Sequence, residues 1–192
     1  MNEDVGRRSQ KKQQTQNDII AAALELFDEW GYDETSIEEI AEAAGVSRRT
    51  FFRYFPSKDA VVFPHSEARL AIFQSMLASH RKKDDPLDTL QNAFVTIGED
   101  YMANRKLIGK QSRVIRATPS LADHDQNLDL AWEETVAQFL QKHHRRCDKS
   151  NAGLVAGALV GALRAAIRQW QANHRRTDLL DLSNQIFSMI QI

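Results

Sequence analysis

Apolar residues recur at helical spacing from Ile19 onward, and the first set is Ile19, Ile20, Ala23, Leu24, Phe27 and Trp30. This spacing predicts an amphipathic helix. Gly31 follows at the position where a left-handed residue commonly ends a helix. Residues 1–17, before this pattern, are polar and hold Arg7, Arg8, Lys11 and Lys12. They are predicted to form a flexible basic arm.

Two short helices are predicted after Gly31. Thr35 or Ser36 can cap the first, because a glutamate stands three residues after each and either pair makes a capping box. Gly45 permits a sharp turn, Ser47 can cap the second helix, and Pro56 ends it. Two short helices joined by a glycine turn are typical of a helix-turn-helix, whose second helix can enter the major groove of DNA.

The rest of the chain shows helical periodicity, no convincing strand alternation and no internal repeat, so the predicted fold class is all-α. The segments expected to be helical are residues 58–63, 66–80, 87–101, 105–116, 128–140, 150–172 and 177–190. Pro64 removes a backbone hydrogen bond and clashes with the preceding turn, so a break or a kink is expected near Phe63.

Charge is segregated along the chain, although the net charge is only −1. Residues 18–42 hold nine acidic side chains and no Lys or Arg. Basic side chains gather on either side of this run, in residues 7–12 and at Arg48, Arg49, Arg53 and Lys58. Two basic patches suit a surface that contacts phosphates at two places. The alternative is an ordinary solvated surface, on which Arg53 pairs with the acidic first helix.

Several functional classes lack their sequence signals. The single cysteine, Cys147, excludes an internal disulfide, and His143, His144 and Cys147 have no carboxylates at ligand spacing, so no metal site or cofactor is expected. No glycine-rich phosphate loop or nucleophile elbow is present, so no enzyme is expected. The apolar runs are too short to span a membrane and no secretory signal precedes them, which predicts a cytoplasmic protein.

The ordered motifs AA-x-x-LF-x-x-x-GY, TS-x-x-x-IA-x-x-AGVS and T-x-FRYF-x-x-K occur within residues 18–62. With them the chain resembles the TetR family of bacterial transcriptional regulators. The resemblance implies a basic arm (1–17), a DNA-binding domain (18–63) and a helical regulatory and dimerisation domain (64–192). It implies a homodimeric repressor that a small-molecule effector releases from a palindromic operator in double-stranded DNA. The alternatives are a DNA-binding activator or architectural regulator without a ligand, and an enzyme or protein-interaction module with a similar start.

The resemblance also implies roles for individual residues. Arg48 and Arg49 match positions that face base edges, where arginine can bond bidentately to guanine. Tyr54 and Lys58 match phosphate-contacting positions, although Tyr54 also fits a core role. The start of the first short helix can hold a phosphate through a hydroxyl and free N–H groups. The predicted DNA-binding residues are Thr35, Ser36, Ser47, Arg48, Arg49, Thr50, Phe52, Tyr54 and Lys58.

In this family the middle helices of the C-terminal domain hold a ligand, and the last two helices form the dimer. Candidate pocket residues for a small apolar or amphipathic effector are Phe73, Met76, Phe94, Tyr101, Trp132, Val136 and Phe139, each of which also fits a plain core. A stripe of small residues allows close helix approach. The predicted dimer residues are Gly153, Gly157, Gly161, Ala165, Leu179, Leu182 and Ile186. The alternative is that both helices pack only inside the monomer.

Overall fold

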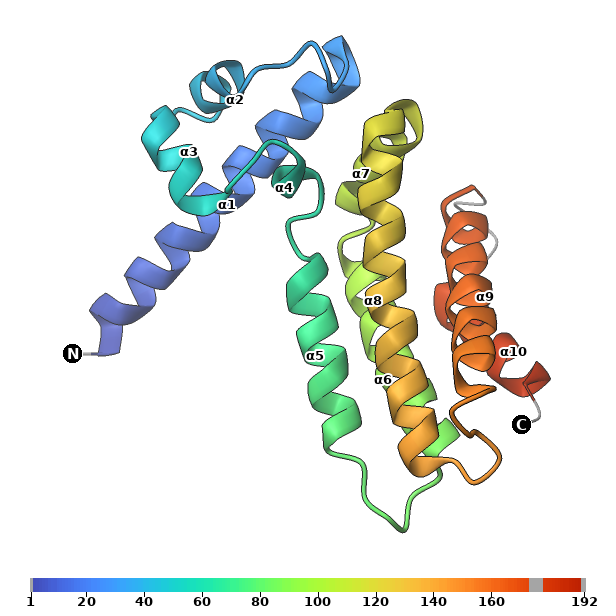
Figure 1. Ribbon diagram of the computed structural model, residues 1–192. Coiled ribbons are helices and arrows are strands. Elements are labelled where there is room, and N and C mark those ends of the chain that lie inside the picture. The colour runs from blue at the N-terminus through green and yellow to red at the C-terminus, as the bar shows by residue number, and fades with distance from the viewer. Residues whose placement is uncertain (1, 173–177, 191–192) are drawn as a thin grey trace. The chain divides into compact units, whose positions relative to one another are not determined.

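The computed structural model describes residues 2–172 and 178–190 (Figure 1). These residues form helices and contain no strand, which confirms the all-α prediction. The helices pack into two compact units. The first consists of residues up to Pro64 together with Lys106–His124, and the second of His65–Arg105 together with the described residues from Asp125 onward. The predicted domain over 64–192 is therefore not one packing unit, because residues 106–124 pack with the N-terminal helices.

The N-terminal unit contains α1 (Asn2–Trp30), α2 (Ile37–Ala43), α3 (Arg48–Tyr54), α4 (Asp59–Val62), nearly all of α7 (Arg105–Ala117) and the start of α8 (Pro119–His143). Helix α1 packs against α2 and α4, and α2 packs against α3. The apolar faces of these helices meet in one core, with Leu24, Phe51 and Val61 almost completely buried. Val114 of α7 and Leu121 of α8 complete this core.

Helix α1 extends much further than the apolar pattern predicted. Residues 2–17, expected to be a flexible arm, form its N-terminal turns. No helix breaker stands in this segment other than Gly6, and side chains four residues apart bond along its surface, Gln13 to Asn17 at 3.2 Å and Gln14 to Asp18 at 2.7 Å. The prediction was wrong because a solvated helix has no buried stripe, so its sequence lacks the apolar periodicity.

Helix α7 binds the acidic half of α1 through opposite charges. Lys110 lies 3.0 Å from Glu25, and Arg113 lies 3.1 Å from Asp28. The hydrogen bond from Arg113 lowers the pKa of Asp28. Part of the acidic run is thus neutralised by basic residues that lie far away in the sequence.

Pro64 breaks the helix instead of kinking it. Helix α4 ends at Val62 and α5 (Ser66–Ala78) begins at Ser66. Proline has no N–H, so the break leaves backbone carbonyls of α4 without helical partners. The buried side chain of Gln111 donates from Nε2 to the Val62 carbonyl at 2.9 Å and satisfies one of them.

The second unit contains α5, α6 (Pro86–Ala103), most of α8, α9 (Ala152–Ala172) and α10 (Leu179–Met189). Helix α6 packs against α5 and α10, and α10 also packs against α9. The predicted bounds hold within a few residues except for α8, which begins nine residues before the predicted 128. Pro119 ends α7 yet also starts α8, because proline is tolerated in a first helical turn, where its N–H would have no partner.

Candidate nucleic-acid interface

Local hydrogen bonds define the helix-turn-helix. Ser36 caps α2: its Oγ accepts from the Glu39 N–H at 3.2 Å, and the Glu39 carboxylate accepts from the Ser36 N–H at 2.8 Å. Of the two capping boxes that the sequence allowed, the structure forms this one. Gly45 adopts φ +66° in the turn, a left-handed conformation that other residues rarely adopt. Ser47 caps α3 as predicted, with its Oγ accepting from the Thr50 N–H at 3.1 Å.

The core side of α3 determines which side chains face outward. Phe51 is fully buried and Phe55 nearly so, with their ring centroids 6.0 Å apart. Anchoring these two rings leaves the opposite face of the helix in solvent. Arg49 and Arg53 lie on that face, and Arg48 and Phe52 are exposed beside it. Helix α3 therefore presents three guanidinium groups and an aromatic ring to solvent.

The three arginines differ in their contacts. Arg48 forms an ion pair with Glu38 at 3.0 Å and lies 5.5 Å from the centre of the Phe52 ring. Both partners of this ion pair are more than half exposed, so the pair stabilises little and can be replaced by a phosphate or a base. Arg53 lies over the Tyr54 ring at 5.2 Å instead of pairing with the first helix. Arg49 is exposed and forms no hydrogen bond, ion pair or ring contact with the described residues.

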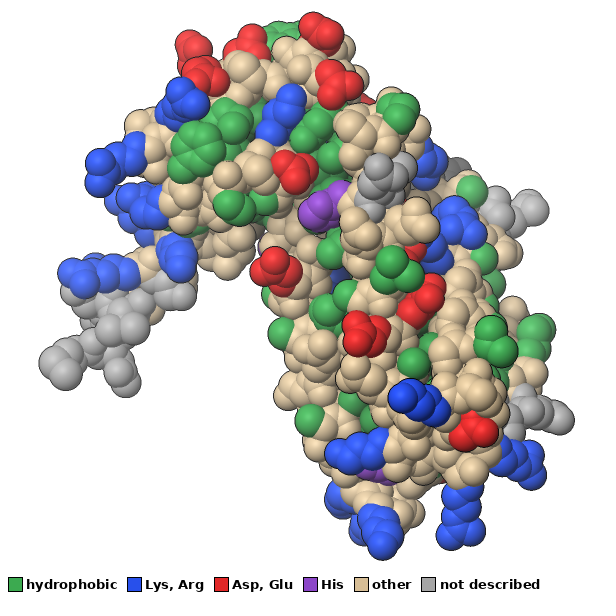
Figure 2. All heavy atoms as spheres, in the orientation of Figure 1, with side chains coloured by type: hydrophobic (Ala, Val, Ile, Leu, Met, Phe, Trp, Pro, Cys, Tyr) green, Lys and Arg blue, Asp and Glu red, His purple; other side chains and the backbone are tan. Residues whose placement is uncertain are grey.

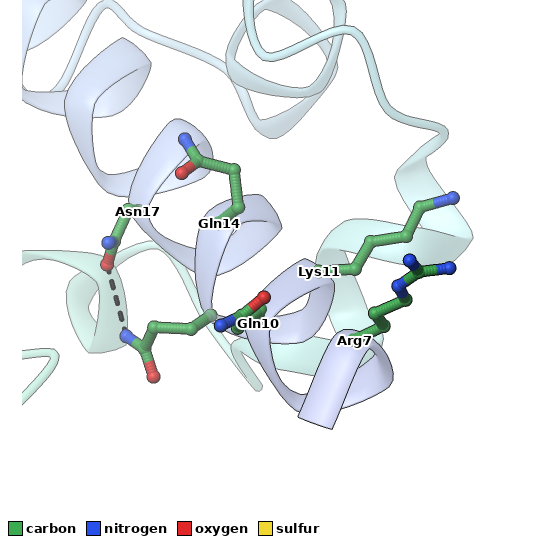
Figure 3. A pocket seen from close by; sticks show the side chains of 6 residues that line it. Arg7, Gln10, Lys11, Gln14 and Asn17 are labelled. Atoms are coloured by element: carbon green, nitrogen blue, oxygen red, sulfur yellow. Dashed lines mark hydrogen bonds between the residues drawn. The ribbon is translucent and has the colours of Figure 1, made fainter. Parts of the chain in front are cut away.

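Basic and acidic side chains occupy different parts of the N-terminal unit. In Figure 2, Lys and Arg gather over α3 and the N-terminal part of α1, whereas Asp and Glu lie over α2 and the turn before it. The N-terminal part of α1 also carries an open surface pocket. The long side chains of Arg7 and Lys11 extend side by side there (Figure 3), and Gln10 and Gln14 also line this pocket. These basic surfaces can attract the phosphates of DNA.

Two predicted phosphate contacts have other roles in this structure. Thr35 is buried, and its hydroxyl donates to the Gly31 carbonyl at 2.8 Å, so it caps the end of α1. The Lys58 ammonium donates to the carbonyls of Tyr32 and Thr35 at 2.7 and 2.9 Å and lies 4.3 Å from the centre of the Tyr32 ring. Burial raises the pKa of Tyr32 to about 12. Thr35 and Lys58 therefore hold the loop between α1 and α2.

The geometry of Lys58 predicts a stability defect. Lys58→Met keeps the aliphatic length but leaves the loop carbonyls without their charged donor. We expect the free energy of unfolding to fall by about 1–3 kcal/mol. Urea denaturation checks this, with Lys82→Met, an exposed lysine in the loop before α6, as the control. If the Lys58→Met variant were as stable as the wild-type protein and its DNA binding depended less on salt, Lys58 would instead contact phosphates.

The remaining predicted contacts lie at helix starts or on the edge of the core. The hydroxyl of Ser36 donates to Glu39 at 2.7 Å, and its backbone bond to this carboxylate lowers the pKa of Glu39. A carboxylate thus stands at the start of α2, where a phosphate was expected. Ser47 bonds to Thr50, hydroxyl to hydroxyl, at 3.0 Å. Tyr54 is half-buried and packs against the core of the unit.

The candidate pocket residues lie in the second unit and pack together. Phe73, Val136 and Phe139 are buried in its core, and Met76, Phe94, Tyr101 and Trp132 pack against it, half-buried. The ring centroids of Phe73 lie 4.5 Å from Phe94 and 4.8 Å from Trp132. The predicted set thus shares one core, in which Phe73, Phe94 and Trp132 form an aromatic cluster, and this arrangement serves a plain core as well as a ligand site.

The predicted dimer residues divide between an outer and an inner face. Gly153, Gly161 and Ala165 are exposed on α9, and a Cβ at either glycine would meet nothing within 4 Å. Gly157 is half-buried, with the Glu133 carboxylate 3.5 Å from such a Cβ. Leu179 is buried inside the monomer, which contradicts its predicted interface role. It packs inward because α10 lies against α6 and α9 of the same chain.

Leu182 and Ile186 are half-buried, and Ile186 packs against the core of the second unit. Both residues are therefore partly covered within the monomer. This leaves α9, and not α10, as the helix with the larger exposed apolar face.

The sequence reading missed a group of charged residues in the second unit. Arg69 is buried, and its Nε lies 2.6 Å from Oδ2 of Asp100. Arg164 pairs with Asp125 and Asp129. Burial raises the pKa of Tyr101, whose phenol interacts electrostatically with both arginines. One signal was available: Arg69 stands four residues before Phe73, on the buried face of α5.

The histidines and the cysteine near the end of α8 make contacts only with their neighbours among the described residues. His143 packs against His80 with ring centroids 4.5 Å apart, and burial raises the pKa of the Cys147 thiol. No three metal-ligating side chains come together in the described part of the chain. Within those same residues, every helix is too short or too polar to cross a membrane.

Comparison with known proteins agrees with this architecture. Residues 19–63 match the family described as bacterial regulatory proteins, tetR family, and residues 84–192 match the MftR C-terminal domain. The chain is 31% identical over 172 residues to the Mycobacterium tuberculosis transcriptional regulator MftR, named for mycofactocin biosynthesis, with coverage of 86% of this chain and 83% of that protein. It is 34% identical over 122 residues to the transcriptional regulator TcmR of Streptomyces glaucescens, covering 60% of this chain and 54% of TcmR.

A solved structure shares the fold. The Thermus thermophilus repressor FadR, in complex with lauroyl-CoA, superposes with a TM-score of 0.60 at 24% identity and covers 91% of this chain and 92% of its own. Matches to an N-terminal helix-turn-helix family and to a C-terminal domain together span most of the sequence. The chain therefore belongs to the TetR family of bacterial transcriptional regulators, which bind DNA through a helix-turn-helix.

Proposed function

We propose that this protein is a homodimeric repressor that binds a palindromic operator and is released by a small-molecule effector. The observation that carries the proposal is the outward face of α3, where Arg48, Arg49 and Phe52 are exposed while Phe51 anchors the helix from behind. A helix presented in this way can enter the major groove and bring its arginines to guanine edges. Arg49, which forms no hydrogen bond or ion pair with the described residues, is the proposed direct reader.

The outer face of α9 supports a dimer. Gly161 and Ala165 are exposed there without long side chains, and Leu154 is 76% exposed on the same helix. A small, apolar helix face lets a second helix approach closely and gains stability when water is excluded. A two-fold dimer would present two copies of α3 to two half-sites, which is the symmetry of a palindrome.

The aromatic cluster of the second unit supports an amphipathic effector. Phe94 and Trp132 are half-buried next to the fully buried Phe73, so part of this cluster stays reachable. The fold is shared with a repressor that was crystallised with lauroyl-CoA. A regulator without a ligand is the alternative, favoured by the dense packing of the same residues as a core.

Selection of duplexes from a random pool tests the proposal directly. The purified full chain should enrich an inverted repeat whose half-sites lie about one helical turn, or roughly 34–36 Å, apart. Adding lauroyl-CoA should then lower its affinity for the selected duplex. Enrichment without an effect of any acyl compound would favour the ligand-free alternative, and no enrichment would contradict a sequence-specific regulator.

The basic turns of α1 give a further prediction about affinity. Arg7 and Lys11 lie on the same side of the helix (Figure 3), so we propose that both contact the DNA backbone. The double variant Arg7→Ala/Lys11→Ala should weaken binding to selected and random duplexes alike. The slope of log affinity against log salt should fall by about one for each lost phosphate contact. The matched control is Lys82→Ala/Lys83→Ala in the loop before α6, and equal effects of the two double variants would contradict the contact.

A further inference from the structure

Arg69 is a buried cation with an unused donor. Its side chain is only 9% exposed, and its Nε donates to Asp100. Its Nη2 is buried, and none of the described residues accepts a hydrogen bond from it. A buried donor without a partner costs free energy, more so on a charged group, so it marks a place where an acceptor is expected.

The surrounding contacts hold the guanidinium in place. Asp100 is itself fixed, because Asn104 donates from Nδ2 to its Oδ1 at 2.9 Å. The Tyr101 ring lies 4.7 Å from the guanidinium carbon. Because Asp100 and the Tyr101 ring hold the guanidinium in place, Nη2 of Arg69 needs no rearrangement to bind a ligand. The Asp100 side chain is 44% exposed, so this group lies close to the surface of the unit.

The charges near Arg69 select the kind of acceptor. Asp100 neutralises Arg69, and the nearby Arg164 is bonded to two carboxylates, Asp125 and Asp129. Two guanidinium groups thus face three carboxylates, so the cluster has no excess positive charge to attract an anion. A neutral oxygen can accept from Nη2 without adding a further negative charge.

The neighbouring rings indicate the rest of the ligand. Phe73 lies one helical turn after Arg69 on α5 and contacts Phe94 and Trp132. The Tyr101 ring, which lies beside the guanidinium, packs against the core that contains Phe73, so an acceptor at Nη2 would lie beside apolar groups of this core. We propose that Nη2 of Arg69 binds the carbonyl oxygen of a neutral ester, thioester or amide group carried on an apolar chain. This inference rests on the proposed effector site and names the chemistry that the site recognises.

Binding of three probes with the same apolar chain tests the inference by titration calorimetry on the full chain. Methyl decanoate offers a neutral carbonyl, decanoate a carboxylate, and decylamine a cation that cannot accept a hydrogen bond. The wild-type protein should bind methyl decanoate most tightly. A preference for decanoate would overturn the neutral-acceptor assignment, and a preference for decylamine, or no binding of any probe, would overturn the site.

Arg69→Lys supplies the decisive variant, because it keeps the positive charge next to Asp100 but removes Nη2. Methyl decanoate should bind roughly 10–100-fold more weakly to it, whereas decylamine binding should not weaken. The matched control is Arg81→Lys, an exposed arginine of the same unit whose Nε and Nη2 are both bonded to Asp84. Thermal unfolding of both variants verifies folding, and Arg69→Met/Asp100→Asn replaces Arg69→Lys if that variant is unstable.

Unchanged methyl decanoate affinity in the Arg69 variants would overturn the inference. The outcome is separable from the proposed repressor function, because the same proteins are tested for binding to the selected duplex without any probe. Duplex binding with no Arg69-dependent probe binding contradicts this site alone. Arg69-dependent probe binding without duplex selection would contradict the repressor and leave the carbonyl site in place.

Discussion

Replacing Arg49 with alanine is expected to weaken operator binding by about 1–3 kcal/mol for each half-site, because a direct base contact is lost. In a dimer with two half-sites this amounts to roughly 30-fold to 20,000-fold in affinity. Arg49 is chosen because it is exposed on α3 and, unlike Arg48, forms no ion pair with the described residues. Its side chain can reach DNA without first leaving a partner.

The measurement compares the Arg49→Ala variant on the selected duplex and on random duplexes at one salt concentration. Loss of a base contact affects the selected duplex and relaxes one base position in each half-site. Arg116→Ala is the matched control, since it removes the same charge from an exposed position on α7 of the same unit. An equal loss on selected and random duplexes would assign Arg49 to the phosphates.

Gly161→Leu is expected to dissociate the dimer and, with it, to lower operator affinity by roughly 1,000-fold or more, because a monomer reads one half-site. Within the monomer the new side chain meets open space, as a Cβ at Gly161 has no atom within 4 Å. Leucine is also a better helix former than glycine, so folding should not suffer. Loss of the dimer would therefore point to a clash with a partner helix.

Sedimentation velocity measures the assembly state of the Gly161→Leu variant. Gln141→Leu, an exposed position near the end of α8, tests whether any added leucine alters association. A Gly161→Leu protein that stays dimeric would remove this part of α9 from the interface. A monomeric wild-type protein that still selects an inverted repeat would contradict the dimer itself.

The sequence by itself determined the elements whose hydrogen bonds are local. Ser47 and its α3 partner are three residues apart, so this cap could be recognised from spacing, whereas spacing narrowed the cap of α2 to Thr35 or Ser36. That the helix is interrupted near Pro64 followed from the chemistry of one residue, although the structure decided that the interruption is a break and not a kink. The side chains of α3 expected to face DNA came instead from the resemblance to the TetR family, and the structure adds that Phe51 and Phe55 are buried.

Only the tertiary structure decided the contacts between residues far apart in sequence. Lys58 bonds to a carbonyl 23 residues earlier, Arg69 to a carboxylate 31 residues later, and Lys110 to one 85 residues earlier. An exposed-looking lysine therefore became a loop anchor, α7 joined the N-terminal unit, and a buried arginine retained an unused donor. Charge and polarity along a chain show which groups need partners, but the packing of distant helices selects the partner that each group finds.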